Sequence, residues 1–328
     1  MKKLSKLIMM MFAALSAVGC KDMGESATTT KIYYTSTDGN KLFPYIYEPY
    51  TFGAILLSNE YQNGAGVMEF DNTLTIIGDV AFGACETLQS ITIPESVTSI
   101  GASAFWGCAN LTNIHIPNRV AFIGNCAFTN CSQLESINIP PRVTLIDYGT
   151  FDCCFNLKEI DIPDSVTAIG DSAFNNCKSL TRLTLGSGIT HIGEMAFCSC
   201  SNIEAINIPD NTTDIGDHAF HGCYCTTTLT LGDNLTHIGA WAFANCPNIS
   251  TVTLPESLTS IGDGAFSDCT KLEKIYCKAT TPPAAGKYVF ANTLPSHRIY
   301  VPTESLQAYK TAEGWSEYAI YIKGYDFE

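Results

Sequence analysis

The sequence predicts a solenoid in which short coils of one kind stack on one another. Three observations predict it: an isoleucine recurs every 23 residues between positions 77 and 261, a phenylalanine follows five residues after each isoleucine, and a cysteine follows three residues later. A unit this small cannot bury its apolar side chains alone, so neighbouring coils must bury them together. We therefore look for function on a surface repeated along a rod, and not in a pocket of a globule.

Residues 1–19 have the pattern of a targeting segment. Three lysines among the first six residues precede an apolar run over residues 7–18, which is too short to span a bilayer as a mature helix. The run ends in Ala17-Val18-Gly19-Cys20, which resembles a bacterial lipoprotein signal, although such signals prefer leucine where Ala17 stands. The resemblance implies that Cys20 is the lipidated first residue and that residues 20–30 are a polar tether. An ordinary signal peptide cleaved near Ala17 is the alternative.

Residues 31–70 do not follow the repeat. The β-rich segments 31–36 and 41–47 flank Asp38-Gly39-Asn40, so we expect a β-hairpin there, and Val67 to Phe70 suggests another strand. Solenoids need atypical ends that shield the open core. We therefore interpret residues 31–70 as an N-terminal β cap.

Residues 71–277 are predicted to form about nine coils, with a parallel strand on one side and short turns or 3₁₀ or helical turns on the other. In one copy, Ile91 and Ile93 point inward from a strand that ends at Pro94, because proline has no N–H for the ladder. A glycine follows each isoleucine of the 23-residue series except the one before Asp147. We expect a tight left-handed turn at this position, which glycine and, less readily, aspartate tolerate. Ala104 and Phe105 then fall in a short helical or 3₁₀ turn.

The repeat, written I-P-x-x-V-x-x-I-G-x-x-A-F-x-x-C, resembles the leucine-rich repeat of BspA-like bacterial surface proteins. The resemblance implies a leucine-rich-repeat solenoid and attachment to host matrix proteins or to other cells. Departures at Thr212, Thr226, Gly186 and Gly232 suggest local loosening near residues 212–228.

Residues 278–328 leave the repeat and are interpreted as a C-terminal cap. Pro282-Pro283 breaks the pattern, residues 298–302 predict a strand, and residues 305–312 predict a short helix. The segment then carries four aromatic residues: Trp315, Tyr318, Tyr321 and Tyr325. They fit a plug over the last coil, and a platform that stacks on carbohydrate is the alternative.

The nine cysteines of the repeat are interpreted as a spine of small buried side chains. Equivalent residues on adjacent coils lie about 5 Å apart, but their Cβ vectors run side by side, whereas a disulfide needs convergent vectors. Two alternatives stay open near residues 198–225: a disulfide between Cys198 and Cys225, and a zinc site. The zinc site would draw on Cys198, Cys200, Cys223, Cys225, His218 and His221.

The outward strand positions are the candidate binding residues, and they are mostly Thr, Asn and Ser with one charged band. The candidates are Thr92, His115, Asn138, Glu159, Asp161, Arg182, Thr184 and Asn207, together with Trp106 and Trp241 on turns outside the core positions. An extended binding face and a plain soluble sheet surface both fit this pattern.

The chain contains none of the motifs H-E-x-x-H, G-x-S-x-G or a P-loop, so we expect neither an enzyme nor a cofactor or metal. Its 328 residues carry a formal net charge of -14, so nucleic acid is not an expected partner. The hypothesis is an exported, monomeric lipoprotein, anchored to the outer membrane and exposed at the surface, that binds host or cell-surface proteins. The alternative is a glycan-binding accessory lipoprotein that uses the C-terminal aromatics.

Overall fold

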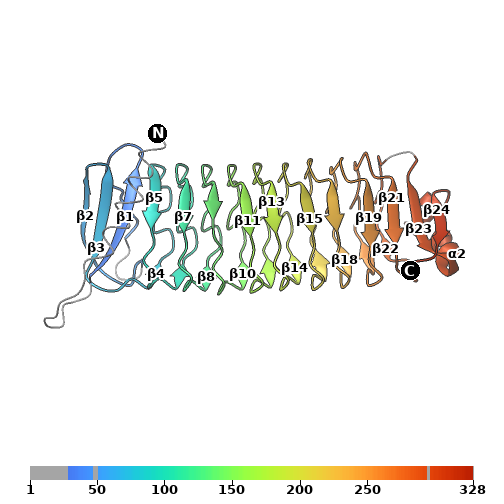
Figure 1. Cartoon of the computed structure of the whole chain (residues 1–328), viewed down its shortest axis with the longest axis horizontal. Helices are drawn as coiled ribbons and strands as arrows, with labels where there is room; N and C mark the ends of the chain where they lie inside the picture. Colours follow the sequence, from blue (N-terminus) through green and yellow to red (C-terminus); the bar gives the residue numbers. More distant parts are fainter. Residues whose placement is uncertain (1–28, 47–50, 294–295, 328) are drawn as a thin grey trace.

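The computed structural model describes residues 29–46, 51–293 and 296–327. The predicted signal peptide, the candidate lipidation residue Cys20 and most of the tether lie outside these residues. The molecule is a rod of stacked coils with strands along two opposite sides, and each end of the rod is covered by a cap (Figure 1). Within the described ranges, no helix has the length and apolar composition that crossing a membrane requires.

Two rows of parallel strands run along the rod, which confirms the predicted leucine-rich-repeat solenoid. In the front row, the hydrogen-bonded pairing is interrupted between β9 and β11, between β13 and β15, and between β17 and β19. The front sheet consists of β5 (Leu88–Thr92), β7 (Asn113–His115), β9 (Ser136–Ile137), β11 (Glu159–Asp161), β13 (Arg182–Thr184), β15 (Ala205–Asn207), β17 (Thr228–Thr230), β19 (Thr251–Leu254), β21 (Lys274–Cys277), β23 (Arg298–Pro302) and β24 (Ile322–Tyr325). The back sheet consists of two-residue strands: β4 (Ile76–Ile77), β6 (Ser99–Ile100), β8 (Phe122–Ile123), β10 (Leu145–Ile146), β12 (Ala168–Ile169), β14 (His191–Ile192), β16 (Asp214–Ile215), β18 (His237–Ile238), β20 (Ser260–Ile261) and β22 (Ala284–Ala285).

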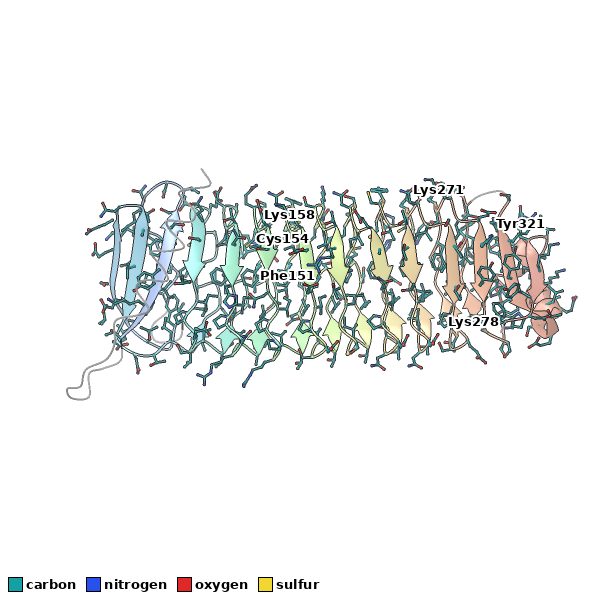
Figure 2. The ribbon with its side chains drawn as sticks, viewed as in Figure 1. Phe151, Cys154, Lys158, Lys271, Lys278 and Tyr321 are labelled. Atoms are coloured by element: carbon teal, nitrogen blue, oxygen red, sulfur yellow. The ribbon has the colours of Figure 1, made fainter. Side chains whose placement is uncertain are left out.

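The core between the sheets is a column of equivalent side chains. From Phe82 to Phe290, each phenylalanine ring stacks on the next with centroids 5.1–5.8 Å apart and interplanar angles of at most 18°. Figure 2 shows Phe151 and Cys154 inside the rod, whereas Lys158 of the same coil reaches its edge. Burying a side chain as large as phenylalanine contributes roughly 1.5–3 kcal/mol. The repeated sequence therefore stabilises the stack through one apolar layer per coil.

The segment between each isoleucine and phenylalanine forms turns that are bonded to the next coil. In one coil, Ser172 and Asn176 have φ of 56° and 60°, and their N–H groups donate to carbonyls of the following coil. Between them, the N–H of Phe174 donates to Ala196 O at 2.8 Å. Left-handed residues recur at these two positions in coil after coil. The N–H groups of every second residue in the turn therefore point along the rod. These turns form a third row of hydrogen bonds between coils, beside the two rows of strands.

The recurring glycine after each isoleucine was expected at a left-handed turn, and this expectation is wrong. At Gly216 no positive φ occurs, but an added Cβ would lie 2.7 Å from Glu194 N and 2.8 Å from Gly193 C of the preceding coil. The position thus needs glycine because two backbones approach closely. At Asp147, where the glycine is missing, the back sheet is interrupted between β8 and β10.

The predicted loosening near residues 212–228 is also absent. Thr212 and Thr226 replace apolar residues, yet both are fully buried and their hydroxyls donate to Ile189 O at 3.0 Å and Ile203 O at 2.9 Å. Because a buried hydroxyl that finds an acceptor is not left unsatisfied, threonine fits here without opening the coil.

The N-terminal end is a small antiparallel sheet, but its hairpin differs from the expected one. Strand β1 (Thr30–Ser36) lies between β3 (Ala65–Phe70) and β5, antiparallel to both. Residues 41–46 form no strand. The hairpin instead joins β2 (Leu56–Gln62) to β3 through Asn63 and Gly64, whose φ values are 53° and 83°. An Asn-Gly pair between β-rich segments favours this turn.

At the C-terminal end, the parallel ladder continues past residue 277. Strand β23 pairs with β21, and β24 pairs with β23. Between β23 and β24 the chain forms the short helices η1 (Thr303–Ser305), α2 (Leu306–Thr311) and η2 (Ser316–Tyr318). Trp315 is buried against Tyr309 and donates its Nε1–H to Pro283 O at 2.7 Å. Trp315 and the buried Tyr318 therefore close the last coil, as the plug interpretation predicted.

Candidate functional site

The front sheet carries a shallow groove between two rows of outward side chains, here called the front groove. One part has a volume of about 430 Å³ across β5, β7 and β9, and a second part of about 350 Å³ continues across β9 and β11. Ser136, Ile137 and Asn138 line both parts. Asn113 and Ser136 stand on one side and His115 and Asn138 on the other, because strand residues alternate in direction. Of the predicted residues, His115 and Asn138 line the first part, and Asn138, Glu159 and Asp161 line the second.

The two sides of the groove differ in how firmly their side chains are held. The side-chain amide of Asn138 accepts from Ile116 N at 2.9 Å and donates to Ile116 O at 2.8 Å. The side chain thus makes the two hydrogen bonds that a backbone partner would make in a strand ladder. Ser136 Oγ donates to Asn113 Oδ1 at 2.8 Å. The side chain of His115 is exposed, and its ring makes no hydrogen bond within the described ranges. Asn138 therefore shapes the groove, whereas His115 has both ring nitrogens available for a partner.

The predicted charged band forms a compact ion-pair cluster at the β11 end of the groove. Arg182 contacts Glu159 Oε2 through Nη2 at 2.8 Å and Asp161 Oδ1 through Nη1 at 3.2 Å. The pKa of Arg182 is raised above its usual value, first because Glu159 accepts its hydrogen bond and then because Asp161 is close. Two carboxylates surround one guanidinium, so this end of the groove keeps a net negative charge.

Thr184 and Asn207 lie further along the same face. Both are exposed, and Asn207 Oδ1 accepts from Thr230 Oγ1 at 2.9 Å. Thr92, at the other end, is the in-register neighbour of His115 on β5. Its Oγ1 accepts from Tyr33 N at 3.0 Å, which ties the first front strand to β1 of the N-terminal sheet.

The two candidate tryptophans lie on turns and not in the front groove. Trp106 is 44% exposed and remains available for contact. Trp241 is half-buried: its ring is parallel to His218, with centroids 6.5 Å apart, and it covers Gly264 of the next coil. Trp241 is therefore held in place by its neighbours, in contrast to Trp106.

Eight of the nine repeat cysteines form the predicted buried spine, whereas the first, Cys85, is only partly buried. The structure adds a polar role for the eight. From Cys108 to Cys269 they are fully buried, and each thiol points to the carbonyl of the phenylalanine 26 residues earlier, at 3.1–3.6 Å. Burial is the main cause that raises the pKa of thiols such as Cys131 well above the ordinary value. The fourteen cysteines of the described ranges are all free, so the alternative disulfide between Cys198 and Cys225 is not formed.

The zinc alternative gains no support from the geometry. Cys200 and Cys223 point into the core, whereas Cys225 is exposed and its thiol lies 3.6 Å from Asn202 Oδ1. Among residues 29–46, 51–293 and 296–327, no three His, Cys, Asp or Glu side chains are placed to hold a metal ion.

Sequence reasoning missed a polar row on the back sheet. His191, Asp214, His237 and Ser260 are in-register neighbours on β14, β16, β18 and β20. His191 Nδ1 lies 2.7 Å from Asp214 Oδ2, and His237 Nδ1 lies 2.8 Å from Ser260 Oγ. In a hydrolytic triad the acid orients the base that activates the serine. Here Asp214 contacts His191, whereas Ser260 contacts the other histidine, His237, so no single histidine joins the acid to the serine. The row could have been found in the sequence, because each of its residues directly precedes an isoleucine of the 23-residue series.

The two rows of parallel strands, and a core in which each buried position recurs once per coil, define a leucine-rich-repeat solenoid. Six copies of a model described as BspA type leucine rich repeat region match residues 65–181 and 190–312. The chain belongs to that family.

Solved structures resemble the chain at moderate identity. A leucine-rich repeat protein from Bacteroides ovatus is 27% identical with a TM-score of 0.50, and the match covers 65% of this chain and 66% of that one, just under two thirds. A leucine rich cell surface protein from Faecalibacterium prausnitzii is 26% identical, with a TM-score of 0.49 and coverage of 81% and 85%. A leucine rich repeat protein from T. pallidum is 27% identical, with a TM-score of 0.48 and coverage of 53% and 82%. No curated protein matches the chain.

Proposed function

We propose that this protein is a cell-surface adhesion module that binds an extended segment of another protein in the front groove. The observation that carries the proposal is the continuity of the groove from β5 to β11, with its sides built from side chains one coil apart. Repeat proteins commonly bind along such extended faces. A shallow, open depression suits a peptide segment better than a small molecule, which usually needs a concave pocket that encloses it.

The chemistry of the groove specifies the partner further. Asn113, His115 and Ser136 offer donors and acceptors, and the excess carboxylate at Glu159 and Asp161 favours a lysine or arginine at one end of the bound segment. The chain as a whole carries a formal net charge of -14, which would steer basic partners toward it. Trp106 on the adjoining turns is a further contact candidate.

A pair of serine substitutions tests the groove. Ser136→Arg places a long cation in the groove, whereas Ser99→Arg places the same side chain on the back sheet at β6. Binding of the purified chain to immobilised matrix proteins and to whole cells is measured by surface plasmon resonance and cell pull-down. We expect Ser136→Arg to weaken binding at least tenfold and Ser99→Arg to leave it within twofold. Equal effects of both variants, or no binding by the unmodified chain, would contradict the proposal.

The location belongs to the same proposal: a lipid on Cys20 holds the rod on the outer face of the outer membrane. The BspA-like resemblance and the lipoprotein-like segment support it. Protease shaving of intact cells should degrade the chain, and Cys20→Ala should release it from the membrane fraction. Full protection from protease in intact cells, together with digestion after lysis, would place the rod inside the envelope and contradict the proposed surface exposure.

A further inference from the structure

A second, separate surface lies at the opposite end of the front sheet, on β21, β23 and β24 (Figure 1). Tyr276 and Tyr300 are in-register neighbours whose rings stack with centroids 4.9 Å apart and an interplanar angle of 16°. Tyr325 packs edge-on against both, at 5.5 and 5.6 Å, and Phe327 packs against Tyr325 at 4.9 Å. These four residues are called the front aromatic cluster.

The cluster does not serve the core. The last coil is closed by Tyr309, Trp315 and Tyr318, which are buried. Tyr325, in contrast, is 43% exposed on the outward face of β24. Tyr276, Tyr300 and Phe327 are half-buried beside it, so the four rings form a partly exposed aromatic patch flanked by polar residues, which is typical of a contact surface. The front aromatic cluster therefore needs an explanation other than capping.

A depression of about 420 Å³ lies beside the cluster, and polar side chains line it together with two of the rings. Tyr325 and Phe327 form the apolar wall. The polar rim residues are Lys278, Thr280, Glu256, Glu304 and Asp326. Figure 2 shows Lys278 near this end of the rod. Lys278, Glu256 and Glu304 are exposed and make no ion pair within the described ranges. The ammonium, the hydroxyl and the carboxylates are thus free to bond a ligand.

We propose that this depression binds a neutral oligosaccharide. One face of a sugar ring presents C–H groups, which pack on the negatively charged face of an aromatic ring, and its edge presents hydroxyls that both donate and accept. The rim supplies both kinds of partner: Lys278 donates, and Glu256, Glu304 and Asp326 accept. The three carboxylates would repel an anionic ligand. A neutral polyol, in contrast, donates its hydroxyls to them and packs its C–H face on Tyr325 and Phe327.

The front aromatic cluster is compact. Tyr325 packs against both Tyr276 and Tyr300, and Phe327 lies 4.9 Å from Tyr325 and 6.4 Å from Tyr276. The glycan hypothesis drawn from the sequence rested on four C-terminal aromatics. Trp315 and Tyr318 are buried, and only Tyr325 of the four C-terminal aromatics named there lines the depression.

Affinity electrophoresis of the purified full chain tests the proposal. Native gels contain one neutral polysaccharide each: amylopectin, xylan, galactomannan or mixed-linkage β-glucan. We expect at least one to retard the chain. Tyr325→Ala should lower that affinity at least tenfold, and Tyr325→Phe should keep it within threefold because the ring remains. Tyr224→Ala is the matched control, because Tyr224 is 52% exposed on a turn and lines no part of the depression. Circular dichroism and thermal melting establish that each variant is folded.

A double variant separates a sugar site from a cation site. Glu256→Gln with Glu304→Gln keeps acceptors on the rim but removes two negative charges, so polysaccharide binding should persist within about threefold. Retardation by none of the four polysaccharides overturns the proposal. Binding of oligolysine that is lost in both Tyr325→Ala and the double variant would instead define a cation site and equally overturn it. None of these substitutions touches the front groove, so protein binding there can fail or succeed independently.

Discussion

The thiol of Cys131 donates a hydrogen bond to the backbone carbonyl of Phe105, one coil back, with Sγ and O 3.2 Å apart. The same carbonyl accepts from the N–H of Cys108 in its own coil at 3.1 Å. The cysteine is thus small enough for the crowded interior and also bonds one coil to the previous one. Alanine would satisfy only the first requirement.

Cys131→Ala is expected to lower the free energy of unfolding by about 1–2 kcal/mol, because it removes buried volume and a hydrogen bond. Cys131→Ser should cost less, since its hydroxyl can reach the same acceptor. The exposed Cys225→Ala is the control and should change stability by no more than about 0.5 kcal/mol. Urea unfolding followed by circular dichroism measures the three values, and equal values for Cys131→Ala and Cys225→Ala would refute the role given to the spine.

Thiol reactivity should follow burial. Burial raises the pKa of Cys131 well above the ordinary value and that of Cys85 to about 11, so at pH 8 these thiols carry little of the reactive thiolate. We expect iodoacetamide to modify Cys225 first in the native chain and the spine only after denaturation. Peptide mass mapping over time measures the order. Early modification of Cys131 in the absence of denaturant would contradict the predicted protection.

The glycine after each core isoleucine should resist substitution even by alanine. Gly216→Ala places a Cβ against backbone atoms of the preceding coil, and we expect a loss of about 2 kcal/mol or more. Asp147→Ala tests the same position in the coil where a Cβ is already present, so its cost should stay near that of one lost hydrogen bond, from Tyr148 N to Asp147 Oδ1, about 1 kcal/mol. The difference between the two melting temperatures decides the matter, and a Gly216→Ala variant as stable as the unmodified chain would remove the close-approach explanation.

Acidification should destabilise the turn that contains His221. Burial is the main cause that lowers the pKa of His221 below its usual 6.5, His218 lowers it further, and Asp268 opposes the shift. The unfolded chain therefore takes up a proton at higher pH than the folded chain does. This part of the stability is present above pH 6.5 and is lost as the pH falls below it. His221→Gln should show a smaller drop in melting temperature between pH 7.5 and pH 5.5, and an unchanged drop would disprove the assignment.

The 23-residue period was sufficient to predict which positions of the repeat are buried. The isoleucine, phenylalanine and cysteine positions lie in the core because each packs against the equivalent residue of the neighbouring coil. Their burial could therefore be predicted without information on the rest of the fold. The N-terminal hairpin was misplaced because only Asp38-Gly39-Asn40 was considered as its turn. Asn63-Gly64 is an equally strong hairpin signal. The repeated glycine was assigned to a left-handed turn because a sequence does not distinguish positive φ from close backbone approach.

The candidate site was predicted only as a row of residues. Its shape depends on side-chain choices that no spacing contains: Asn138 folds back onto Ile116, and Arg182 binds two carboxylates at once. The exposure of the two tryptophans was equally open, since Trp241 is covered through its neighbours His218 and Gly264. The front aromatic cluster joins Tyr276 of the repeat to Tyr325 of the cap, so only the folded end brings its members together.

Hydrogen–deuterium exchange with and without a bound matrix protein tests the central claim, that the front groove is the protein-binding surface, most directly. Peptides that contain β5, β7, β9 and β11 are followed beside back-sheet peptides with β6, β8 and β10, at a partner concentration that saturates the chain. The account predicts slower exchange confined to the front strands between residues 88 and 161. Slower exchange in the back sheet, with the front strands unchanged, would contradict it.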